Sequence, residues 1–132
     1  AKTISSLEEL EAETQYVLEV AAITHDIACP MCREMYGNTN GKLQEKEGES
    51  MVRAFLKDSG MSKEEIDRVS YLVGHHHTFS NIDGIDYQIL IEADYIANAA
   101  ESGYTKSSIE NALSKIIKTK SATQLILSMF CL

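Results

Sequence analysis

The sequence contains a His–Asp pair, a run of three histidines and one aspartate at positions that ordinary packing does not explain. His25 and Asp26 follow the apolar stretch VLEVAAIT, and the other histidines are consecutive at 75–77. Asp94 lies within the apolar run QILIEADYIANAA. An imidazole or carboxylate that leaves water costs several kcal/mol unless it is paired or bound to a metal. Imidazole and carboxylate together suit divalent first-row transition metals.

Each of these features also has an ordinary structural explanation. A lone His near a helix end is more often a satisfied core or capping residue than a ligand. A His triplet at a loop is often a solvated turn, and a mid-helix Asp can bond to a neighbouring hydroxyl or amide. Their joint order along one chain, His-Asp, then His-His-His, then Asp, favours a metal site over these explanations.

A second candidate, the CPMC motif at 29–32, has the two-residue spacer of redox and zinc motifs. A thioredoxin-like motif requires a preceding strand, whereas the preceding run is predicted to be helical. A structural zinc site would require a second cysteine pair, and Cys131 is a single distant partner. Proline in the first turn of a short helix explains the motif without chemistry. We therefore expect partly buried thiols here and assign the chemistry to the His–Asp pair.

Helices are expected to position these groups, because apolar residues recur at helical spacing and no strand pattern competes. Ser6 and Glu9 predict a capping box that opens a helix over about 7–28, with His25 above Leu18 and Ala21. Ser62 and Glu65 predict another such box. Asp86 is expected to cap a long apolar helix through Glu101, ended by Gly103. The other helices are expected over 43–60, 105–118 and 121–132, with loops at 36–42 and 74–84.

The fold class predicted is therefore all-α, as one domain over 1–132 with five to seven helices. The composition, 44% hydrophobic and 24% charged, is that of a globular protein. A net charge of −8 argues against large nucleic acids as partners. No apolar run is long enough to cross a membrane, and three cysteines without a secretion signal predict a cytoplasmic protein. A homo-oligomer is left open, because LILSMFCL at 125–132 would pack as core or meet a partner.

The order of the motifs resembles the HD-domain superfamily of metal-dependent phosphohydrolases. The matching segments are AAITHDIA at 21–28, LVGHHHT at 72–78 and ILIEADYIAN at 89–98. The resemblance spans roughly 13–103 and implies a bundle of helices that holds a divalent metal ion. Manganese, iron, zinc, nickel and cobalt all suit such ligands.

By this resemblance, His25, Asp26 and Asp94 would be metal ligands. Asp26 would also orient the attacking water, and His76 and His77 would act catalytically or hold a second metal. A phosphate also needs cationic partners, so we expect Arg33 and Lys42, which follow the His–Asp pair, and His75 to bind the substrate's phosphate. Taken singly, Arg33 and Lys42 are more often ordinary surface charges.

The sequence departs from the family pattern in two places. The family's metal cage begins with a His on a preceding helix, and no His precedes His25, so we expect an N-terminal helix missing from this chain. Two-metal members also carry a His at the start of the middle helix, where this chain has Gln44, Glu45 and Glu47. This favours one metal ion, with a second held by Glu and His as the alternative.

Two functions remain after these considerations. The first is a metal-dependent phosphohydrolase that hydrolyses a phosphate ester of a nucleotide or another small molecule, using metal-activated water. The alternative is a non-catalytic helical domain in which a degenerate metal site binds a ligand or a partner. The sequence does not name the substrate, because the loops that would set specificity carry no readable code.

Overall fold

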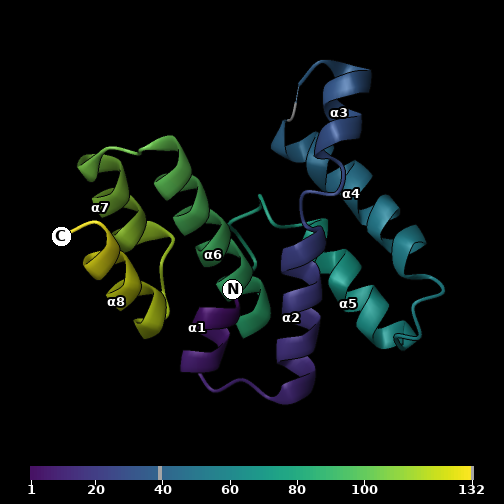
Figure 1. Cartoon of the computed structure of the whole chain (residues 1–132), viewed down its shortest axis with the longest axis horizontal. Helices are drawn as coiled ribbons and strands as arrows, with labels where there is room; N and C mark the ends of the chain where they lie inside the picture. The colour runs from purple at the N-terminus through teal and green to yellow at the C-terminus, as the bar shows by residue number, and fades with distance from the viewer. Residues whose placement is uncertain (39, 132) are drawn as a thin grey trace. The chain divides into compact units, whose positions relative to one another are not determined.

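The computed structural model of the chain describes residues 1–38 and 40–131, and every regular element within them is an α-helix. The all-α prediction is confirmed. The helices, shown in Figure 1, are α1 (Lys2–Leu7), α2 (Ala12–Thr24), α3 (Cys29–Tyr36), α4 (Gly41–Leu56), α5 (Lys63–Val73), α6 (Ile85–Ser102), α7 (Lys106–Lys115) and α8 (Lys120–Met129). None of these helices is both long enough and apolar enough to cross a membrane.

The chain divides into two compact units. One unit joins Ala1–Gln15 to Phe79–Leu132, and the other is Tyr16–Thr78. The single domain predicted over 1–132, with a missing N-terminal helix, stays a prediction.

The unit Tyr16–Thr78 is built around the hairpin of α4 and α5, which pack against each other. Gly48 of α4 allows this close approach, because a Cβ atom there would lie 3.0 Å from Cγ1 of Val73. Helices α2 and α5 both end close to the histidines predicted to be functional, so the ends of these two helices position the candidate site. The buried apolar side chains of the unit are Val17, Leu18, Ala21, Ala28, Cys32, Val52, Leu56, Val69, Leu72 and Val73.

In the other unit, α6 is the central helix and contacts α1 and α8. The side chain of Glu92 is fully buried on α6, and its two carboxylate oxygens accept hydrogen bonds from the start of α8. The oxygen Oε2 accepts from the backbone nitrogens of Lys118, at 2.6 Å, and Thr119, at 2.8 Å. The oxygen Oε1 accepts from the Thr119 hydroxyl at 2.6 Å. Glu92 thereby satisfies donors that a helix start leaves open, which is a structural role.

The expected helix over 7–28 is wrong, because the chain breaks between α1 and α2. The break follows from Glu9, whose φ of 55° is left-handed, so Ser6 and Glu9 do not open a helix. The helix α2 then ends at Thr24. His25 therefore lies in the turn after α2 and not over an apolar helix face.

Other helix boundaries are confirmed or shifted by local chemistry. The capping box of Ser62 and Glu65 is present at the start of α5, and Gly103 ends α6 in the left-handed conformation. The N-cap of α6 is Gly84, so the prediction that Asp86 caps this helix is wrong. The helix α4 ends at Leu56, before the expected stop at Gly60.

The remaining expectations fall close to the observed elements. Thr105 caps α7, which ends at Lys115, and α8 begins at Lys120. The predicted loop at 36–42 is the connection between α3 and α4, and its residue 39 lies outside the described residues. Residue 132 of the last predicted helix also lies outside them.

Candidate metal centre

Two imidazoles in the unit Tyr16–Thr78 are fixed in the same way by helix ends. Nδ1 of His25 lies 2.6 Å from the carbonyl oxygen of Ala22 at the end of α2. Nδ1 of His76 lies 2.6 Å from the carbonyl oxygen of Val73 at the end of α5. A carbonyl only accepts, so each Nδ1 carries a hydrogen and donates it. When the imidazoles are neutral, each Nε2 therefore has the lone pair that a metal ion requires.

Both Nε2 atoms face the carboxylate of Asp26. Nε2 of His25 lies 3.2 Å from Oδ2, and Nε2 of His76 lies 3.9 Å from Oδ1. The two rings meet edge-on, with centroids 5.2 Å apart and an interplanar angle of 83°. His76 is fully buried, whereas the Asp26 side chain is 58% exposed. One face of the carboxylate is thus lined by imidazoles while another stays open to solvent.

This donor set fits a cation. Neutral imidazole nitrogens and carboxylate oxygens are all acceptors here, so the His25–Asp26 contact requires either a second proton on the ring or a metal ion between them. Two ligands bonded to one ion at about 2.1 Å lie about 3 to 3.5 Å apart, a range that includes the His25–Asp26 separation. The C-terminal ends of α2 and α5 also carry negative partial charge, which favours a cation near them.

The side chains of His25, Asp26 and His76 do not form a complete coordination shell. Within residues 1–38 and 40–131, no group of three or more His, Cys, Asp or Glu side chains is arranged to hold a metal ion. The separation of 3.9 Å between His76 and Asp26 explains this, because it is wider than one ion would span without adjustment.

The surroundings of Asp26 favour the ionised form of its carboxyl. When the imidazoles are protonated, the hydrogen bond from His25 lowers the pKa of the Asp26 carboxyl most, while burial opposes this and the charges of His25 and His76 add to the lowering. The Cys29 thiol also donates to this carboxylate. Burial, followed by the charge of Asp26, raises the pKa of Cys29 to about 11, so this thiol stays protonated at neutral pH. A protonated thiol is a poor nucleophile, which supports the choice of the His–Asp pair over the CPMC motif.

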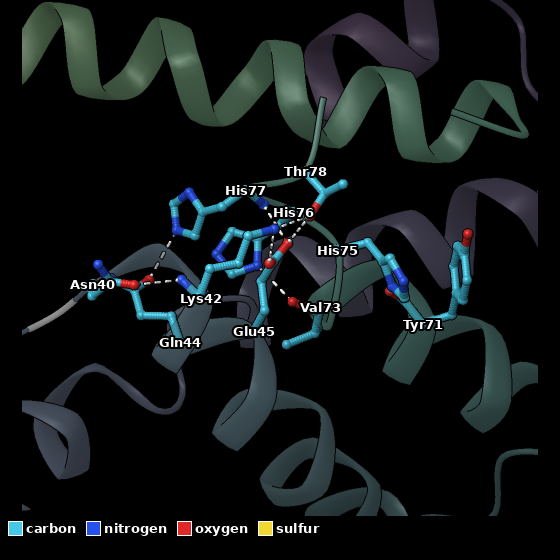
Figure 2. Close-up of polar contacts among 10 residues, drawn as sticks. All are labelled: Asn40, Lys42, Gln44, Glu45, Tyr71, Val73, His75, His76, His77 and Thr78. Carbon is cyan, nitrogen blue, oxygen red and sulfur yellow. Dashed lines mark hydrogen bonds and ion pairs between the residues drawn. The ribbon is translucent and has the colours of Figure 1, made fainter. Parts of the chain in front are cut away.

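The third histidine, His77, belongs to a polar network on α4 that Figure 2 shows. Nε2 of His77 lies 3.0 Å from Oε1 of Gln44. The buried carboxylate of Glu45 accepts from the backbone nitrogen of His77 at 3.1 Å and from the hydroxyl of Thr78 at 2.7 Å. Nζ of Lys42 lies 3.2 Å from Glu45 and 3.0 Å from the Thr78 hydroxyl. The network fixes the segment that carries His76 to the start of α4.

His75 has a different environment. Its ring stacks on Tyr71, with centroids 4.0 Å apart, and its Nδ1 lies 2.7 Å from the Tyr71 carbonyl oxygen (Figure 2). The guanidinium of Arg68 lies 5.2 Å from the centre of the Tyr71 ring on the same helix. The predicted role of His75 in phosphate binding stays a prediction.

Two further predicted residues, Arg33 and Asp94, lie on α3 and α6. Arg33 is exposed on α3, and its predicted contact with phosphate stays a prediction. Asp94 is half-buried on α6, in the other compact unit, and its predicted role as a ligand also stays a prediction.

The comparisons with known proteins agree with the motif order. A family model described as "HD domain" matches residues 1–115. The chain belongs to the HD domain family. A bifunctional uridylyltransferase/uridylyl-removing enzyme of Cupriavidus metallidurans is 39% identical over 67 residues. That match covers 51% of this chain but 7% of the relative's length, so it concerns one part of a much larger protein. No solved structure gives a significant match.

Within this HD domain, sequence reasoning overlooked the residues that position the histidines. Gln44 and Glu45 stand out in the sequence only as replacements for an expected histidine, and Thr78 only as the end of the LVGHHHT segment. Their polar side chains on a segment that must pack against the His triplet were the available indication. The sequence could not indicate the role of the backbone carbonyls of Ala22 and Val73, because every residue type carries a carbonyl.

Proposed function

We propose that this HD domain is a metal-dependent phosphohydrolase that hydrolyses a phosphate ester of a nucleotide or another small molecule. The observation that carries the proposal is the convergence of two imidazole Nε2 atoms, from His25 and His76, on the carboxylate of Asp26. Two imidazoles and one carboxylate on an open site form a donor set that suits a catalytic divalent ion.

The residues would divide the work as follows. His25, Asp26 and His76 would hold the ion, with Asp94 as a further ligand predicted from the sequence. When bound, the ion would make water nucleophilic near neutral pH and polarise a phosphoryl oxygen. The exposed part of the Asp26 carboxylate would accept a hydrogen bond from the attacking water and orient it.

Two groups of the α4 network suit the phosphate. Lys42 is 75% exposed, yet Glu45 and Thr78 hold its ammonium in place beside the His triplet. An ammonium held in this way has a proton left to donate to a phosphate oxygen. His77, whose Nε2 contacts Gln44, would supply a proton to the leaving oxygen after that contact opens.

The similar protein from Cupriavidus metallidurans supports a phosphoester as substrate. Its name includes a uridylyl-removing activity. A uridylyl group is attached through its phosphorus atom, so removing the group breaks a bond to that phosphorus. The shared segment is small, and the substrate of this chain is part of the proposal.

The test measures metal content and turnover in the same preparation. Protein purified without a chelator or a His-tag would be loaded separately with manganese, iron, zinc, nickel or cobalt. It would then be assayed with p-nitrophenyl phosphate and bis-p-nitrophenyl phosphate. We expect release of p-nitrophenol with at least one ion, and its loss in Asp26→Ala.

The control is Glu34→Gln, which changes an exposed carboxylate of α3 and should leave turnover unchanged. A protein that binds an ion but turns over neither ester would favour the non-catalytic ligand-binding domain. A protein that binds none of the five ions would refute the proposal altogether.

A further inference from the structure

A second hollow lies on the α4–α5 hairpin, at the end where α4 leads into α5. It has a volume of about 660 Å³. This is within the range of about 300 to 1,000 Å³ that is typical of small-molecule sites. Its lining comprises Ser50, Arg53, Ala54 and Lys57 of the α4 side and Met61, Lys63, Ile66 and Asp67 of the α5 side.

Helical spacing explains why the hollow exists. Positions 50, 53, 54 and 57 share one face of α4, and positions 63, 66 and 67 share one face of α5. On the α4 side, Ser50 and Ala54 are exposed and carry small side chains, which leave room in the hollow. On the α5 side, Ile66 and Met61 supply an apolar wall.

The charge of the lining is opposite to that of the chain. Three of its residues are basic and one is acidic, whereas the whole chain carries −8. Nη1 of Arg53 forms an ion pair of 2.5 Å with Oδ1 of Asp67, which fixes the guanidinium on one wall. Lys57 and Lys63 are exposed at the rim, one on either side of the turn. An anion would thus meet two exposed ammonium groups beside an apolar surface.

We propose that this hollow binds a small organic anion with an apolar body, such as an alkyl phosphonate or a related amphiphile. The anionic group would lie between Lys57 and Lys63, and the apolar body would cover Ala54, Met61 and Ile66. The proposal does not depend on the metal centre, because none of the lining residues belongs to the His25–Asp26–His76 set. The hollow would therefore serve as a binding site separate from the proposed catalytic one.

The experiment is a titration of the full chain with hexylphosphonate, followed by ¹H–¹⁵N NMR. This probe has a carbon–phosphorus bond, so a phosphohydrolase does not cleave it as an ester. We expect saturable shifts of the amide signals of Ala54, Met61 and Ile66. The expected affinity is about millimolar, as for other fragments of this size.

Three comparisons decide the outcome. The double variant Lys57→Glu/Lys63→Glu should weaken binding by about tenfold or more, whereas the matched pair Lys106→Glu/Lys120→Glu should not. Ala54→Leu should abolish binding by filling the hollow while the helix remains folded. Asp26→Ala should bind the probe as the wild type does, which separates this proposal from the proposed hydrolase activity.

Three other results would overturn the proposal. These are shifts that do not saturate, equal binding of neutral 1-hexanol, and unchanged affinity in the Lys57→Glu/Lys63→Glu variant. Inorganic phosphate alone should bind more weakly than hexylphosphonate, because it lacks the apolar body. Equal or tighter binding of inorganic phosphate would show that the apolar wall contributes nothing.

Discussion

His25 and His76 present the same ring nitrogen to the same carboxylate from the ends of two different helices. Nδ1 of each ring donates to the backbone carbonyl oxygen three residues earlier, at 2.6 Å in both cases, and this bond orients the ring. The shared target is Asp26, which lies 3.2 Å from one ring and 3.9 Å from the other. In the proposed metal site, both Nε2 lone pairs would bind the same ion.

Replacing a member of this set should remove bound metal. We expect about one transition metal ion per chain in protein purified without chelator, measured by elemental analysis. His25→Ala and Asp26→Ala should each lower the affinity by about 100-fold or more, because a ligand is lost and not merely an outer contact. Asp94→Ala tests the third predicted ligand and should have a similar effect.

The matched control for this series is His75→Ala. Its ring stacks on Tyr71, so its removal should leave the metal content as in the wild type. Equal loss of metal from His75→Ala and His25→Ala would contradict the proposed ligand set.

Glu45 should act as a positioning residue for the His triplet. Its carboxylate is buried and serves Lys42, Thr78 and the backbone of His77, so Glu45→Gln replaces an acceptor by a donor. We expect a loss of about 1–3 kcal/mol in the free energy of unfolding. We also expect a metal affinity lower by about 10- to 100-fold, as is usual for outer contacts of a metal site.

Affinity would be measured by calorimetry well below the unfolding temperature, with circular dichroism to verify that the variant is helical. Thr78→Val, which removes only the hydroxyl, should show a smaller loss in both quantities. A Glu45→Gln variant that is destabilised but binds metal normally would assign Glu45 a purely structural role.

Glu92 should matter for stability alone. The Glu92→Gln side chain would place an amide against the backbone donors of Lys118 and Thr119. We expect a cost of about 2–3 kcal/mol in chemical denaturation, because at least one buried donor loses its acceptor. Glu101→Gln, at an exposed site on the same helix, should cost nothing measurable. A wild-type denaturation midpoint for Glu92→Gln would show that the buried carboxylate is not needed.

The three thiols should differ in reactivity. Cys131 is exposed, Cys32 is fully buried, and Cys29 has a pKa raised to about 11, mainly by burial. A thiol reacts through its thiolate, and the thiolate fraction falls as the pKa rises above the pH, so Cys29 should react slowly at neutral pH and faster as the pH rises towards 11. Alkylation followed by mass spectrometry should therefore label Cys131 first. Rapid formation of a disulfide between Cys29 and Cys32 under mild oxidation would revive the redox interpretation.

Local sequence was sufficient where local chemistry decides the structure. The capping box of Ser62 and Glu65 and the glycine that ends α6 both form as the sequence predicts, because each involves residues within one turn. The order of His25, Asp26 and the His triplet was enough to indicate the family, which the family model confirms.

The sequence was insufficient where distant packing decides the structure. It did not show that His76 faces Asp26 while His75 stacks on Tyr71, because adjacent residues in a turn can point in either direction. The sequence also did not predict the break at Glu9. The left-handed backbone conformation of a glutamate depends on its surroundings, and no local sequence pattern predicts it. The burial of Glu45 depends on a contact 32 residues away in the chain.

The two carbonyls that orient His25 and His76 are among those that a helix end leaves without a helical partner. One further turn added to α2 or α5 would draw Ala22 or Val73 back into the helical hydrogen-bond ladder and release the imidazole. In the proposed metal site, the lengths of these two helices would therefore decide whether the imidazoles are held in place. A single inserted residue at either end would move the imidazole away from its carbonyl and disrupt the proposed site, although every proposed ligand remained in the sequence.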